Sequence, residues 1–150
     1  MLGVALASFA ALSVVLAVVD LRHHRLPHVL VLPGLALALG LLTATALADG
    51  AFERVAGVWG GAASAFLVCL LLHGVRPAAF GGGDVTLSAL VGAHLGWFGA
   101  DAVITGLVAG FACGGAAAAG ALLAGLRRAE VAFGPPLLVG AWWVLLRAMT

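Results

Sequence analysis

The sequence is poor in charge and contains no lysine. Of its 150 residues only 9% are charged and 64% are hydrophobic, and the mean hydropathy is +1.22. Soluble domains carry about 25% charged residues, so the composition excludes a soluble domain and indicates an integral membrane protein. The net charge of +1 argues against nucleic acid as a partner.

Cysteine is also scarce. Cys69 and Cys113 each lie inside an apolar run and form no Cys-x-x-Cys pair, which argues against a metal knuckle and a disulfide framework. Both are expected to be small core residues. No run alternates polar and apolar residues as a membrane barrel requires.

Long apolar runs dominate the rest of the chain. A helix needs about 20 residues to cross the hydrocarbon layer, and the N-terminal run lacks the positive start of a signal peptide, so it is read as a retained span. We therefore predict an all-α bundle in which residues 1–150 form a single transmembrane domain. The predicted spans are Leu2 to Val19, Val29 to Ala48, Val55 to Leu72, Val85 to Ala100, Ala102 to Leu126, and Val131 to Leu146.

Arginine placement predicts the orientation, because positive residues of short loops stay in the cytoplasm. The odd-numbered loops hold five arginines, and the opposite side holds Arg54 and Arg147. This distribution places the N-terminus outside, and Asp20 and Asp84 then both meet the cytoplasmic face. The five arginines are Arg22, Arg25, Arg76, Arg127 and Arg128.

Asp20 and Asp84 are the strongest candidates for chemistry, because a carboxylate beside hydrocarbon is costly and usually functional. Two adjacent carboxyls that share a proton can hydrolyse a peptide bond, one as general base on water and the other as general acid. The pair would need no metal and no organic cofactor. A proton-coupled carrier also uses paired acids, but the internal repeat typical of carriers is missing.

Several neighbours of the aspartates are candidate site-shaping residues. Gly81, Gly82 and Gly83 permit backbone angles closed to other residues and are expected to leave space for an extended substrate backbone. Arg22 is a candidate partner for a carboxylate or a plain positive-inside anchor. The glycines of the third and fifth spans are interpreted as close helix packing: Gly57, Gly60, Gly61, Gly106, Gly110, Gly114 and Gly115.

The histidines are given structural roles. His23, His24 and His28 are read as part of a loop beside lipid headgroups in preference to a metal cluster. His94, inside the fourth span, is expected to be a satisfied core histidine too deep for ready contact with Asp84.

The motifs together resemble the prepilin peptidases, which are membrane aspartyl proteases with a Gly-x-Gly-Asp motif. The resemblance rests on residues 20–27 (Asp-Leu-Arg-His-His-Arg-Leu-Pro) and 81–85 (Gly-Gly-Gly-Asp-Val), and continues through residues 90–96 and 133–137. It implies that Asp20 and Asp84 are the catalytic aspartates, with Pro27 as a site-shaping residue. The implied substrates are pilin and pseudopilin precursors, cleaved at the cytoplasmic face of the inner membrane.

The chain departs from the family pattern in three places. It lacks the two Cys-x-x-Cys pairs of the methylating members, so a short, peptidase-only form is inferred. His28 stands where the family commonly has asparagine, and Thr86 where it commonly has lysine. A presenilin-like or signal-peptide-peptidase-like protease is a second alternative, but such proteases carry the first aspartate in mid-span. Whether the chain forms a homodimer is left open.

Overall fold

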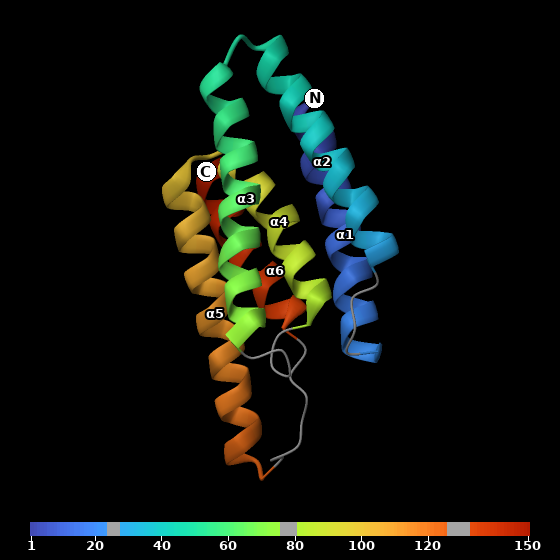
Figure 1. Cartoon of the computed structure of the whole chain (residues 1–150), viewed down its shortest axis with the longest axis vertical. Helices are drawn as coiled ribbons and strands as arrows, with labels where there is room; N and C mark the ends of the chain where they lie inside the picture. The colour runs from blue at the N-terminus through green and yellow to red at the C-terminus, as the bar shows by residue number, and fades with distance from the viewer. Residues whose placement is uncertain (24–27, 76–80, 126–132) are drawn as a thin grey trace.

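The computed structural model describes residues 1–23, 28–75, 81–125 and 133–150, and these form a bundle of six α-helices without a strand (Figure 1). The predicted all-α fold is confirmed. The helices are α1 (Leu2–His23), α2 (His28–Ala48), α3 (Phe52–Val75), α4 (Gly82–Gly96), α5 (Ala100–Leu123) and α6 (Gly134–Met149).

Four of the helices, α1, α2, α3 and α5, are long and apolar enough to cross a membrane. The other two are shorter, with 15 residues in α4 and 16 in α6. At 1.5 Å per residue these two helices measure only about 23 Å, against about 30 Å of hydrocarbon. The chain is thus a polytopic membrane protein in which two short helices pack among four longer ones.

Successive helices run in opposite directions (Figure 1). The ends of α1, α3 and α5 therefore lie on the same side of the bundle as the beginnings of α2, α4 and α6, although α5 projects beyond the others. We call this side the aspartate end, because Asp20 closes α1 and Asp84 opens α4. At the opposite end Gly99, with a φ of 112°, makes the tight predicted turn between α4 and α5.

The short helix α4 is the most buried element and packs closely against α3. A Cβ on Gly92 would overlap the carbonyl oxygen of Gly61, and one on Gly96 would overlap that of Gly57. The Ser88 hydroxyl bridges the same two helices, 3.1 Å from the carbonyl oxygen of Ala65. Because packing and not the hydrophobic effect holds helices together in lipid, these contacts fix α4 in place.

A second glycine contact joins α5 and α6. A Cβ on Gly140 would overlap the backbone at Gly106 and Gly110, and one on Gly114 would press on the Phe133 ring. The predicted packing role is therefore confirmed for glycines of both α3 and α5. It is wrong for Gly60 and Gly115, where a Cβ would meet open space.

The two cysteines differ in their surroundings. Cys69 is buried, as predicted, but Cys113 is exposed on α5. The prediction of a core position for Cys113 is wrong, because an apolar run does not tell which face of a helix looks outward to lipid.

Candidate active site

Asp20 lies in the last turn of α1 with only 3% of its surface exposed. Its carboxylate accepts a hydrogen bond of 3.0 Å from the backbone N–H of Gly134, the first residue of α6. Because Pro135 and Pro136 carry no amide hydrogen, Gly134 supplies the only N–H among these three residues. The N-terminal end of α6, with its partial positive charge, thus faces this carboxylate.

Asp84 lies in the first turn of α4 with 8% of its surface exposed. The Gly81 N–H donates to its carboxylate at 3.2 Å, and the Asp84 N–H donates back to the Gly81 carbonyl at 3.0 Å. This reciprocal arrangement is half of a capping box, with an aspartate in place of the usual glutamate. Asp84 therefore caps the helix that carries it.

The two carboxyls lie within electrostatic range of each other. Asp84 is outside the four membrane-crossing helices. Burial first, and then the negative charge of Asp20, raise the pKa of Asp84 from its ordinary value of 3.8 to about 6, while the Gly81 hydrogen bond lowers it. The structure thus brings together the two aspartates that the sequence singled out, and it favours one proton on the pair below about pH 6.

The glycine run before Asp84 does not adopt unusual backbone angles. Gly81 has φ −70° and ψ 149°, an extended conformation, and Gly82 and Gly83 are already helical. These glycines therefore do not use the backbone freedom that their sequence permits. A Cβ on Gly81 would make ordinary contact with the Asp84 carboxylate oxygen, at 3.4 Å, so the space left for a substrate stays a prediction.

Arg22 does not join the carboxyl pair in the described structure. Arg22 is exposed, and because it follows Asp20 by two positions on α1 it points to a different side of the helix. Pro27 lies outside the described residues, so its place in the site stays a prediction.

One contact at the site joins the two departures from the family pattern. The Nδ1 atom of His28, at the start of α2, lies 3.4 Å from the hydroxyl of Thr86. The Thr86 hydroxyl also donates to the Gly83 carbonyl at 2.9 Å, so the Thr86 oxygen can only accept from His28. The pair links α2 to the turn of α4 that carries Asp84.

Sequence reasoning missed the contact of Asp20 with Gly134. A signal was present, since a glycine before two prolines leaves a single free N–H at the start of a helix. Because the donor and the acceptor lie 114 positions apart, the sequence did not indicate that this N–H would meet Asp20.

Metal ligands do not gather in the described ranges: no three of the histidine, cysteine, aspartate and glutamate residues there form a cluster that could hold an ion. His24 and the side chain of His23 lie outside the description.

These features define an α-helical membrane protein with a buried carboxyl pair at one end. The model of the type IV leader peptidase family matches residues 7–130, which run from within α1 to beyond α5 and include both aspartates. The chain belongs to the type IV leader peptidase family and is a peptidase. Curated proteins gave no match, nor did solved structures.

Proposed function

We propose that the protein is an aspartic endopeptidase that uses Asp20 and Asp84 to cleave the short basic leader from pilin-like precursors. The observation that carries this proposal is the burial of both carboxyls at one end of the bundle, with the charge of Asp20 acting on the pKa of Asp84. Membership in a leader peptidase family supports a membrane-bound precursor as the substrate.

The surroundings of the two carboxyls suggest their roles. Asp20 accepts a hydrogen bond from the Gly134 N–H, and because Asp84 is better suited as the acid, Asp20 is left as the general base. Asp84, with its raised pKa, is the better general acid. Asp20 takes a proton from water as the water oxygen attacks the scissile carbonyl carbon, and Asp84 gives its proton to the carbonyl oxygen. In the tetrahedral intermediate the C–N bond then breaks, the proton held by Asp20 passes to the leaving amine nitrogen, and Asp84 takes back the hydroxyl proton as the carbonyl re-forms. No covalent acyl-enzyme is formed.

The proposed location of cleavage is the cytoplasmic face of the inner membrane. The loops that join the helices at the aspartate end carry four arginines, and exposed Arg22 adds a fifth on the last turn of α1. Arg54 and Arg147 belong to the opposite end, where they lie over the rings of Trp97 and Trp143. The positive-inside rule then puts the aspartate end in the cytoplasm and the N-terminus outside.

Cleavage of a type IV prepilin by the full chain in liposomes tests the proposal. Asp20→Asn and Asp84→Asn should each lower kcat/KM at least about 100-fold, because each removes a group that moves a proton in the transition state. Asp49→Asn and Asp101→Asn are the matched controls, since these exposed acids lie at the opposite end, and they should retain activity. Cleavage at the wild-type rate by either site variant would refute the assignment.

A further inference from the structure

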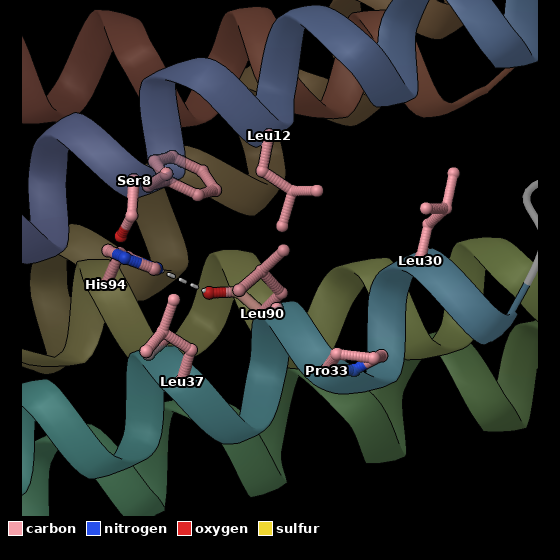
Figure 2. Close-up of a pocket in the computed structure, with 10 residues that line it drawn as sticks. Ser8, Leu12, Leu30, Pro33, Leu37, Leu90 and His94 are labelled. Carbon is pink, nitrogen blue, oxygen red and sulfur yellow. Dashed lines mark hydrogen bonds between the residues drawn. The ribbon is translucent and has the colours of Figure 1, made fainter.

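A cavity of about 240 Å³ lies between α1, α2 and α4 (Figure 2). Its walls are mostly aliphatic, with Leu12 from α1, Leu30 and Leu37 from α2, and Leu90 from α4. Leu30 and Leu37 are also 37% and 51% exposed on the outer surface, so the cavity opens toward the lipid. An apolar cavity of about 150 Å³ already accepts a benzene ring, so this one can hold a large side chain.

One end of the cavity is polar because His94 lines it. His94 is 1% exposed and its ring stacks on Phe9 with centroids 4.1 Å apart. Its Nδ1 lies 2.9 Å from the Leu90 carbonyl, and a carbonyl only accepts, so Nδ1 carries the hydrogen. The Ala5 carbonyl also acts on the His94 ring, but a carbonyl is itself an acceptor. In the neutral ring Nε2 holds a lone pair, and Nε2 is buried without a group that donates to it. The prediction of a satisfied core histidine is therefore wrong for this nitrogen.

Ser8 adds a second acceptor at the same end of the cavity (Figure 2). Its hydroxyl donates to the Ala5 carbonyl at 2.8 Å, so only the lone pairs of its oxygen remain available. Leaving a buried polar atom without a partner is unfavourable, because the atom loses its hydrogen bonds to water. The polar end is thus complementary to a hydrogen-bond donor.

The cavity lies alongside the path from the aspartates into the membrane. Ten residues of α4 separate Asp84 from His94, which corresponds to about 15 Å along the helix axis. Leu30 and Pro33 mark the end nearer the beginning of α2, and His94 and Ser8 mark the far end (Figure 2). A helix that runs parallel to α4 from the aspartates therefore passes the polar end about ten residues after its start.

We propose that this cavity is a specificity subsite for the hydrophobic segment of the substrate, and that it binds a side chain with an O–H or N–H group about ten residues after the cleaved bond. The proposal rests on the proposed function. A lipid acyl chain would fill the aliphatic part but has no donor for Nε2 of His94. A threonine, serine or tryptophan side chain on a substrate helix supplies both apolar surface and the donor.

A substrate scan tests the subsite. In a type IV prepilin, threonine and valine, which have the same shape, are compared at each position from about the seventh to the thirteenth after the cleavage site. The full chain in liposomes should cleave the threonine form about fivefold faster in kcat/KM at one position near the tenth, as one hydrogen bond would give. Equal rates for both forms at every position would overturn the proposal.

Variants of the chain assign the preference to the cavity. His94→Phe keeps a ring beside Phe9 but removes Nε2, and Ser8→Ala removes the hydroxyl; His94→Phe should abolish the preference for threonine and Ser8→Ala should weaken it. His73→Phe and Ser64→Ala make the same chemical changes outside the cavity and should retain the preference. A threonine preference that survives in His94→Phe would contradict the assignment.

Crosslinking separates this inference from the proposed function, because it needs no cleavage. In the Asp84→Asn background, Leu37→Cys should form a disulfide with a cysteine at the preferred substrate position, whereas Leu71→Cys on the outer face of α3 should not. No crosslink, or equal crosslinks at both positions, would overturn the subsite and leave lipid as the occupant. Failure of the proposed function would appear differently, as wild-type protein that cleaves no precursor at all.

Discussion

Asp20 and Asp84 are both buried carboxyls that face a helix N-terminus, but they are held in different ways. Asp84 accepts its hydrogen bond from Gly81, three positions earlier, within the turn that begins α4. Asp20 accepts its hydrogen bond from Gly134 at the start of another helix, 114 positions later. One half of the site is therefore built by local structure, and the other half forms only when α1 and α6 pack together.

The positions of the two carboxyls therefore depend on different parts of the structure. Asp84 keeps its cap as long as α4 is helical, and its place relative to Asp20 depends on how α4 packs against α3. Asp20 depends on α6, which lies beyond the residues that the family model matches. Substitutions in the two regions should therefore have different consequences.

The largest effect is expected at the α3–α4 contact that positions Asp84. Gly92→Leu places a side chain where the Gly61 carbonyl lies, so the helices must separate. Overpacking of this kind costs about 3 kcal/mol or more, and we expect a much lower midpoint of thermal unfolding in detergent. Gly60→Leu is the matched control, because a side chain there meets open space. Equal midpoints for the two variants would refute the close packing of α4 on α3.

A smaller effect is expected where Asp20 depends on α6. Asp20→Ala removes the acceptor for the Gly134 N–H, and loss of a charge-assisted hydrogen bond of about 1.5 kcal/mol should speed amide exchange at Gly134 about tenfold. Asp84→Ala should leave the exchange rate of Gly134 close to that of the wild type. Hydrogen exchange of the peptide that spans Phe133 and Gly134 measures the exchange rate of Gly134 in each variant. Identical rates in Asp20→Ala and Asp84→Ala would show that α6 does not hold Asp20.

The smallest effect concerns His28 and Thr86. Their contact of 3.4 Å is long for a hydrogen bond, so its loss in Thr86→Val should lower kcat/KM only about threefold. The double variant His28→Asn, Thr86→Lys carries the pair of residues that is common in the family. Its loss of kcat/KM should be smaller than the product of the losses in His28→Asn alone and Thr86→Lys alone. Strict additivity in this cycle would mean that the two residues act independently.

The sequence was sufficient for the fold, because apolar runs are local signals. It also singled out two aspartates that the structure buries at the same end of the bundle. It placed all six helices and identified α4 and α6 as the short ones. It could not show that Asp84 lies inside the first turn of α4, since Gly82 and Gly83 are poor helix formers whose propensity tertiary packing overrides. Nor could it pair Asp20 with Gly134, or show that only one of the two ring nitrogens of His94 has a hydrogen-bond partner. Both features depend on how helices that are distant in sequence pack together.

The pH dependence follows from the raised pKa of Asp84. Because the pKa in the folded protein, about 6, lies above the ordinary value of 3.8, the folded state binds this proton more tightly than the unfolded chain. The stabilisation is complete below pH 3.8 and is lost as the pH rises through about 6. Peptide cleavage that uses Asp84 as the acid should decline over the same upper range.

An infrared titration of the protonated carboxyl group of Asp84 tests the coupling of the two aspartates most directly. The carbonyl band that is absent from Asp84→Asn should disappear with a midpoint near pH 6 in the wild-type protein. In Asp20→Asn the neighbouring negative charge is gone, so the midpoint should move to lower pH while staying above 3.8, because burial remains. An unchanged midpoint in Asp20→Asn would show that the two carboxyls do not act as a pair.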